Sequence, residues 1–345
     1  MRESIFSASI RAFFITLFAV AGFLLSFIII IILVGALPSS IDAEPEITYT
    51  YSPSVLPNVE GVRKVMGSDV PVILTINIKG VIGVDSLTQS KIDKLLVESR
   101  ERSLKNDRVK AVLLDIDSPG GSASDSDAIY RAIKTYKEKY KIPVYAYVNG
   151  LCASGGMYIA CAADKIYASD SSLIGSIGVI LSTALNFSQL MDKIGIQSLT
   201  LYDGKGKDSL NPLRPWVAGE DQNIKDIIDY LYKDFVDVVT QARPNLSKEK
   251  LIAVYGANVY PAPLAMEYGY IDEHGYSLNH TLKELLAVAE ISDDNYQVIE
   301  LTSTNWISEL FSSKLELLSG RVTHQLELPN ELPTNLQNKF LYLYR

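Results

Sequence analysis

The sequence predicts an α/β fold with a mostly parallel sheet built from βαβ units, preceded by one transmembrane helix. The first observation is that short β-branched or apolar runs alternate with amphipathic helical patterns from residue 71 onward, a pattern typical of parallel sheets. The second is an uncharged apolar run at residues 12–37, longer than the roughly 20 residues that cross a bilayer. An apolar fraction of 48% in 345 residues also allows a sizeable core.

Each element of the predicted core follows from its local pattern. Runs of apolar and β-branched residues predict strands at 72–78, 111–116, 143–148 and 165–168. Apolar residues at helical spacing predict helices at 90–105, 124–140, 154–163 and 220–243, with another beginning at Ser247. The chemistry of such sheets lies at the carboxyl ends of the parallel strands. Beyond residue 285 the sequence is only weakly patterned.

The apolar run near the N-terminus predicts a membrane anchor. Arg2 and Arg11 precede the run and acidic residues follow it, so the positive-inside rule keeps residues 1–11 in the cytoplasm. The rest of the chain is then expected outside the cytoplasm, held to the inner membrane by residues 12–37. The alternative is a cleaved signal peptide with a site near residues 34–36. The length of the run favours an uncleaved anchor, because signal peptides carry about 7–15 apolar residues.

Composition sets the domain boundaries and excludes some functions. Residues 38–68 contain four prolines without a helical period, which predicts a linker. The predicted core then spans residues 69–284, and 285–345 form an extension of uncertain role. A net charge of −8 argues against nucleic-acid binding. Cys152 and Cys161 lie in small apolar surroundings with no zinc or redox spacing, so we expect both to be buried and expect no metal or cofactor.

Two segments that follow predicted strands are rich in small residues. In the first, Gly120 and Gly121 follow a strand, where free backbone N–H groups could form an oxyanion hole. The alternative is a tight turn between strand and helix. In the second, Ser154 stands between a strand and a helix, where the helix N-terminus would stabilise developing negative charge. The alternative there is a serine that only caps the helix.

A serine nucleophile needs a base, and the sequence offers lysines in a third glycine-rich segment. Lys205 and Lys207 lie in that segment, which on its own is typical of a solvated turn. The histidines, His274, His280 and His324, all lie late in the chain. This scarcity favours a lysine base, although a Ser-His-Asp triad stays open because triads follow geometry and not chain order. A lysine base must be desolvated to lower its pKa.

Four stretches together resemble the signal peptide peptidase A (protease IV) family. They read LLDIDSPGG at 113–121, VNGLCASGGMYIACAADKIYA at 148–168, SSLIGSIGVI at 171–180 and AMEYGYIDEHG at 265–275. The resemblance covers about residues 72–280. It implies a crotonase/Clp-protease-like core and a serine endopeptidase whose Ser-Lys dyad works through an acyl-enzyme.

The resemblance also assigns roles to residues of the small-residue segments. Ser154 matches the nucleophile, and Gly120 or Gly121 matches the oxyanion-hole glycines. The N–H of Gly155 is another candidate oxyanion donor. Ser176 matches a serine that orients the lysine.

The lysine itself is placed by the register of its segment. Lys207, followed by Asp208 and Pro212, fits the register of the family best. The family has a bulkier residue where Gly206 stands here, and this departure leaves Lys205 as the alternative base.

The resemblance implies partners as well. Substrates would be remnant signal peptides and other short apolar peptides. Longer family members carry two core halves, whereas this chain has one, so the resemblance implies a homo-oligomer, a ring of about eight, with the dyad shared between subunits. The competing readings are a SohB-like peptidase, an acyl-CoA enzyme of the crotonase type and a peptide-binding scaffold. The aromatic tail at 338–345 suits a peptide groove by β-addition, with a short packing strand as the alternative.

Overall fold

A computed structural model describes residues 5–35, 50–67, 69–84, 87–292, 295–303 and 339–344 of the chain. Contacts divide the chain into two compact units, Met1–Thr48 and Tyr49–Arg345. Each unit is described by itself below.

The first unit holds one long helix, α1 (Ile5–Gly35). Its segment Arg11–Ile30 is long and apolar enough to cross a membrane. The predicted anchor at 12–37 is therefore helical as far as Gly35, and residues 36–37 lie outside the described part. An apolar helix satisfies its own backbone hydrogen bonds, which is the requirement for a spanning segment.

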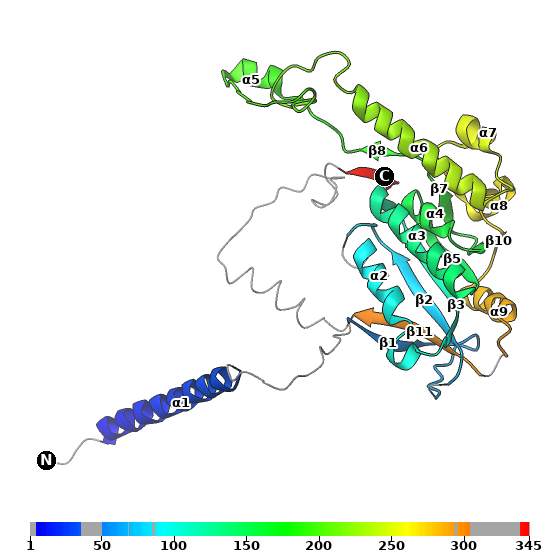
Figure 1. Cartoon of the computed structure of the whole chain (residues 1–345). Coiled ribbons are helices and arrows are strands. Elements are labelled where there is room, and N and C mark those ends of the chain that lie inside the picture. Colours follow the sequence, from blue (N-terminus) through cyan, green and yellow to red (C-terminus); the bar gives the residue numbers. More distant parts are fainter. Residues whose placement is uncertain are drawn as a thin grey trace. The chain divides into compact units, whose positions relative to one another are not determined.

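The second unit is built on a mostly parallel sheet, as the sequence predicted (Figure 1). Its main path runs β1-β11-β2-β3-β5-β6-β10. The bounds are β1 (Tyr51–Leu56), β2 (Val72–Lys79), β3 (Val109–Ser118), β5 (Val144–Ala153), β6 (Lys165–Ala168), β10 (Glu273–His274) and β11 (Gln297–Ser303). Neighbours on this path run parallel except β1, which pairs with β11 antiparallel.

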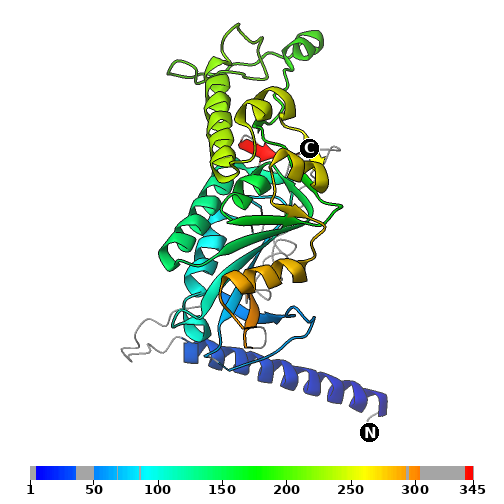
Figure 2. The ribbon, with the colours of Figure 1, turned by 90° about the vertical axis from the view of Figure 1, so that its right-hand side faces the viewer.

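Helices cover both faces of this sheet (Figures 1 and 2). Alternate residues of β2 separate the two layers, since Leu74 and Ile76 pack in the main core with α2 (Gln89–Glu98) and α3 (Ala123–Tyr140). Ile73 points the other way and packs with Leu282 and Leu285 of α9 (Leu278–Val288). Burial on both faces explains why these strands are continuously apolar.

The remaining elements lie around the carboxyl edge of the sheet or connect it to the helices. They are η1 (Arg102–Leu104), β4 (Gly120–Ser122), α4 (Gly155–Ala160), β7 (Leu173–Gly175), β8 (Ile180–Leu181), α5 (Ser188–Ile194), α6 (Gln222–Ala242), α7 (Lys248–Lys250), η2 (Leu251–Tyr255), β9 (Val259–Pro261), α8 (Ala262–Tyr268) and β12 (Phe340–Leu343). Ser247 caps α7 by accepting the Lys250 N–H, as its position predicted.

The structure corrects the predicted boundaries of the core. Residues 51–56, predicted as linker, form the edge strand β1, and residues 297–303, predicted as extension, form β11 inside the sheet. The core therefore reaches beyond 69–284 at both ends. Pro53 made this segment look like a linker in the sequence. An edge strand tolerates a proline, because the missing N–H is not needed by a second neighbouring strand.

Helix α6 is fixed to the core at its C-terminal half. Phe235, Val236 and Val239 are buried there. Just past the helix, Arg243 Nη2 lies 2.6 Å from Asp272 Oδ2. Burial opposes the charge of Asp272, but the Ile166 N–H and Arg243 hold the pKa of that carboxyl below its usual value. The same carboxylate accepts the Ile166 N–H at 2.9 Å, so it ties α6 to β6.

Candidate active site

The ends of three neighbouring strands bring the predicted site residues to one edge. β7 pairs with β5 so that Gly175 lies opposite Ala153, and Ser176 and Ser154 follow directly. β3 pairs with β5 so that Ser118 lies opposite Cys152, and Gly120 stands two residues beyond Ser118. Pairing with β7 extends β5 to Ala153, five residues past its predicted end at 148. The predicted convergence at the carboxyl edge is therefore confirmed.

Ser154 is held in a strained conformation with a free hydroxyl. Its φ of 54° and ψ of −116° are rare for a serine, and such outliers cluster at functional sites. The Ser154 N–H donates to the Gly175 carbonyl at 2.8 Å. The side chain is 1% exposed and makes no capping bond to α4. Among the described residues its Oγ has no hydrogen-bond partner, so the helix-cap interpretation is wrong.

Gly120 and Gly155 line a small space beside Ser154. Gly120 has a φ of 94°, which favours glycine, and a Cβ added to it would lie 2.7 Å from the Gly155 nitrogen. The same Cβ would lie 1.9 Å from the carbonyl oxygen of Tyr342. A Cβ added to Gly155 would lie 3.1 Å from that oxygen. A peptide carbonyl oxygen therefore sits between these two glycines.

Gly121 faces a different neighbour. A Cβ added there would lie 2.0 Å from the carbonyl oxygen of Ile82, with which Gly121 forms a β-bridge. Gly121 also lies opposite Tyr342 in the strand ladder. It supports the wall of the space, whereas Gly120 and Gly155 enclose the carbonyl oxygen itself.

The peptide at this position is the C-terminal tail of the chain. Phe340–Leu343 form β12, which lies antiparallel between β4 and β8 (Figure 1). Its register places Leu343 opposite Gly120 and Phe340 opposite Leu181. The Tyr344 N–H then donates to the Pro119 carbonyl at 2.7 Å. The tail thus adds a strand between β4 and β8, which fits both the β-addition hypothesis and the alternative of a short packing strand.

The side chain of Tyr342 fills an aromatic pocket. It is 1% exposed, stacks on Tyr158 of α4 at 5.2 Å between centroids, and lies 4.5 Å from Phe235 of α6. Its hydroxyl donates to the Leu231 carbonyl at 3.1 Å. The pocket combines aromatic walls with a hydrogen-bond acceptor at its end. Sequence reasoning missed this pocket, although Phe235 stood on the predicted apolar face of its helix.

Tyr158 joins the pocket to α6. Its hydroxyl lies 2.9 Å from Asp234 Oδ2 and 3.0 Å from Asp127 Oδ1. Burial first, and then these two carboxylates, raise the pKa of Tyr158, so the hydroxyl stays protonated and acts as a donor. Tyr158 therefore forms a wall of the pocket and also fixes α4, the helix that follows Ser154, to α6.

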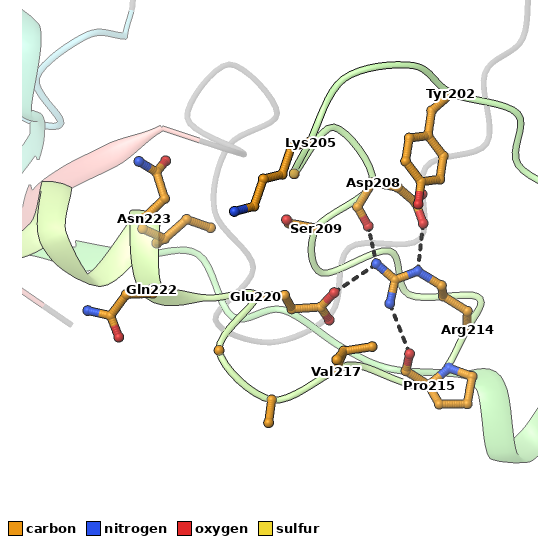
Figure 3. Close-up of a pocket in the computed structure, with 14 residues that line it drawn as sticks. Tyr202, Lys205, Asp208, Ser209, Arg214, Pro215, Val217, Glu220, Gln222 and Asn223 are labelled. Carbon is orange, nitrogen blue, oxygen red and sulfur yellow. Dashed lines mark hydrogen bonds and ion pairs between the residues drawn. The ribbon is translucent and has the colours of Figure 1, made fainter.

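The candidate lysines lie elsewhere, in a segment we call the arm, residues 182–221 between β8 and α6. The arm extends beyond the sheet (Figures 1 and 2). Lys207 is exposed, and the structure of one chain does not bring it to Ser154. Lys205 instead lines a cavity of about 1120 Å³ between the arm and the first turn of α6 (Figure 3). The residues on both sides of Lys207 line that cavity, while Lys207 does not.

The histidines take no part in this arrangement. His274 Nδ1 lies 2.6 Å from Asp170 Oδ1 at the end of β10. His280 stands in the first turn of α9, and His324 lies outside the described residues. Within the described part of the chain, neither of the other two contacts the Ser154 hydroxyl. A Ser-His-Asp triad therefore gains no support.

Comparison with known proteins identifies the core. Residues 136–291 match the model of peptidase family S49. The matched stretch includes Ser154, Ser176 and Lys207. This stretch is therefore similar to peptidase family S49, and we call the second unit, which contains it, the S49 core. Residues 81–190 of the S49 core also match the N-terminal domain of NfeD1b, a stretch that includes the glycines before α3. The resemblance to signal peptide peptidase A is thereby confirmed.

Relatives of the S49 core carry matching names. An SppA homologue of Enterococcus faecium is 32% identical over 212 residues, which cover 61% of this chain and 60% of that protein. Serine protease SPPA of Arabidopsis thaliana chloroplasts is 32% identical over 185 residues, 53% of this chain and 27% of that protein. Protease 4 of Haemophilus influenzae is 26% identical over 244 residues, 69% and 38% of the two chains. The chain thus spans less than two thirds of the length of these relatives.

Solved structures show similarity to the S49 core at low identity. ClpP1 of Listeria monocytogenes is 17% identical with a TM-score of 0.40, covering 60% of this chain and 94% of that one. A membrane-bound stomatin-specific protease is 20% identical with a TM-score of 0.40, covering 68% and 99%.

Proposed function

We propose that this chain is a serine endopeptidase in which Ser154 is the nucleophile and Lys207 is the general base. The observation that carries the proposal is the peptide carbonyl of Tyr342, whose oxygen lies between Gly120 and Gly155. Gly155 directly follows Ser154, whose hydroxyl has no hydrogen-bond partner among the described residues. A bound peptide carbonyl next to a free hydroxyl at the carboxyl edge of a parallel sheet is the arrangement that acyl transfer requires.

The proposed reaction proceeds through an acyl-enzyme. The Ser154 oxygen attacks the carbonyl carbon while neutral Lys207 takes the hydroxyl proton. We propose that backbone N–H groups of Gly120, Gly121 and Gly155 hold the developing oxyanion, each such donor typically contributing about 10²–10³ in rate. Before substrate binds, the Gly120 N–H donates to Ser118 Oγ at 3.1 Å, so it must turn from that hydroxyl to the oxyanion. The lysine then gives its proton to the leaving amine as the C–N bond breaks. Water attacks the ester carbonyl, loses a proton to the lysine, and releases Ser154 with the new carboxylate.

Lys207 is proposed to act on the Ser154 of a neighbouring subunit. The arm that carries it projects from the sheet and exposes apolar side chains, among them Leu199 and Leu201, which are 84% and 86% exposed. A head-to-tail contact through such an arm closes into a ring, for which we propose about eight subunits. Ser176, beside Ser154, is then placed to orient the incoming amino group.

The surroundings of Ser154 favour a neutral lysine. Burial raises the pKa of the Cys152 thiol, two residues from Ser154, because the site disfavours charge. The same effect lowers the pKa of an ammonium group that enters such a site. Assembly would therefore activate the base, since Lys207 becomes desolvated only when the arm meets its neighbour.

The proposed substrates are apolar or aromatic peptides, remnant signal peptides above all. The pocket around Tyr342 accepts a large aromatic side chain, and the ladder with β4 and β8 accepts any extended backbone. A scaffold that only holds peptides would need the same groove. The free hydroxyl of Ser154 in a strained conformation favours catalysis over holding.

A fluorophosphonate probe tests the nucleophile directly. The wild type is expected to become labelled at Ser154, and labelling should be lost in Ser154→Ala and in denatured wild-type protein. Deletion of residues 339–345 should speed labelling, because the tail then no longer covers the groove. If the protein that lacks residues 339–345 is folded and still resists the probe, the nucleophile proposal fails and a peptide-binding scaffold remains.

The same two proteins report on the tail. Because the Tyr342 carbonyl oxygen lies between Gly120 and Gly155, two of the proposed oxyanion glycines, the wild type is expected to cleave its tail after Tyr342. Ser154→Ala is expected to keep the tail. Mass spectrometry of the intact proteins measures this directly. If both proteins retain Arg345, self-cleavage is wrong and the tail only occupies the groove.

Substrates of this kind fit a peptidase at the inner membrane. We propose that α1 is a single-pass anchor with the S49 core outside the cytoplasm. A C-terminal alkaline phosphatase fusion should then be active in cells, because that enzyme folds only outside the cytoplasm. An inactive but full-length fusion would contradict the orientation.

A further inference from the structure

The backbone around Lys207 is only weakly held by its own turn. Gly204 and Gly206 both have positive φ angles, 98° and 82°, so the backbone before Lys207 has unusual freedom. The local turn is closed by the Lys207 N–H, which donates to the Gly204 carbonyl at a long 3.2 Å. Such a turn does not by itself fix a side chain to the accuracy that proton transfer requires.

We infer that Arg214 is a positioning residue for Lys207, holding the lysine segment to the base of α6. The inference rests on the proposed function, because it needs Lys207 as the base. Arg214 itself touches neither the substrate nor Ser154.

The contacts of Arg214 converge on the residue next to the lysine (Figure 3). Its Nε donates to Asp208 Oδ2 at 2.6 Å, and its Nη2 donates to the Asp208 carbonyl at 2.5 Å. The side chain and the backbone of Asp208 are thus both held. The Asp208 side chain is only 8% exposed, and Asn211 Nδ2 also donates to it at 2.7 Å.

The guanidinium also reaches the residues just before α6. Arg214 Nη2 lies 2.7 Å from Glu220 Oε2, two residues before the helix begins. The Glu220 side chain is 12% exposed, so this ion pair is largely shielded from solvent. One planar side chain therefore bridges two carboxylates in fixed directions, a geometry that the freely rotating ammonium group of lysine does not impose.

Helix α6 carries this restraint back to the catalytic core. Further along the helix, Asp234 bonds the hydroxyl of Tyr158 and Phe235 packs against the substrate-like Tyr342. A continuous path of contacts therefore joins the lysine segment, Arg214, α6 and the peptide groove. Because a rigid helix, and not a loop, makes this connection, the lysine segment is held in a defined position relative to the groove.

The pair stays charged throughout the working pH range. The hydrogen bond from Arg214, followed by that from Asn211, lowers the pKa of Asp208 below its usual value. The restraint is therefore complete above the ordinary pKa of an aspartate and weakens only as the pH falls through the depressed value. Loss of the Arg214–Asp208 pair therefore does not account for a change of activity near neutral pH.

Kinetics of Arg214→Ala give the first test. We expect kcat to fall about 10²-fold with KM nearly unchanged, because misplacement of a catalytic group by about 1 Å costs that much. Arg214→Lys should stay impaired, and added guanidinium ion should partly restore Arg214→Ala. Lys225→Ala is the matched control, since it removes an exposed ion pair with Asp221 at the same end of α6. Full activity in Arg214→Ala would overturn the inference.

Subunit mixing gives the second test and separates positioning from general stability. Mixed with Ser154→Ala, which supplies an intact lysine segment, Arg214→Ala should regain activity. Mixed with Lys207→Ala, it should not, because neither chain then supplies a working lysine. Recovery in that second mixture would show that Arg214 does not act through Lys207 and would overturn the inference.

The outcomes distinguish this inference from the proposed function. A fully active Lys207→Ala would refute the proposed base, and the inference with it. An inactive Lys207→Ala beside an active Arg214→Ala would refute the inference alone. If no mixture recovers, even Ser154→Ala with Lys207→Ala, the dyad is not shared, and guanidinium rescue then decides. Absence of rescue in a folded Arg214→Ala protein would count against positioning.

Discussion

Subunits carrying Ser154→Ala, mixed with subunits carrying Lys207→Ala, are expected to regain activity although each protein is inactive alone. Each single change removes one member of a dyad that acts as a unit, which costs about 10⁴-fold or more in rate. In a random one-to-one ring, about a quarter of the head-to-tail interfaces pair an intact serine with an intact lysine. Specific activity should therefore recover to about that fraction of the wild type.

The measurement is peptide hydrolysis before and after subunit exchange, with exchange followed by a mass tag on one partner. Failure to recover after complete exchange would mean that each subunit keeps its own dyad. The pH profile offers a check on the same base, since activity should rise as Lys207 loses its proton. Lys207→Arg should be inactive at every working pH, because arginine stays protonated. Full activity in that variant would transfer the role to Lys205.

Local pattern was sufficient for the elements whose neighbours are close in sequence. The strand-helix alternation predicted β2, α3 and β6 nearly at their observed bounds. The edge strands were missed because their pairing is long-range. β1 joins β11 across about 240 residues, and neither pattern indicates this partner.

The candidate site was predictable only in part, for a related reason. Ser154, Gly120 and Ser176 stand directly after strands, so topology alone brings them to one edge. Lys207 stands on the arm, and because its proposed partner is the Ser154 of another subunit, its placement stays a prediction. Arg214 gave no signal, because an arginine six residues from an aspartate resembles any solvated turn.

Gly120→Ala is expected to lower kcat/KM for peptides by about 10³-fold, the scale of losing oxyanion stabilisation. The added Cβ would lie 1.9 Å from the position of the peptide carbonyl oxygen and 2.7 Å from the Gly155 nitrogen. These neighbours are backbone atoms, which cannot move aside as a flexible side chain can. The change also requires alanine to adopt a φ near 94°, which costs about 1–2 kcal/mol or a shift of the loop.

Gly80→Ala separates the two effects. Gly80 has a similar φ of 82°, but an added Cβ there meets nothing within 4 Å. It lies at the end of β2, and its carbonyl accepts the Ser118 hydroxyl at 2.7 Å. We expect Gly80→Ala to lose a comparable part of its stability to thermal unfolding yet to keep hydrolysis within a few-fold of the wild type. If both variants lose activity equally, the defect of Gly120→Ala is backbone strain. If Gly120→Ala stays fully active, the substrate carbonyl does not bind where the Tyr342 carbonyl lies.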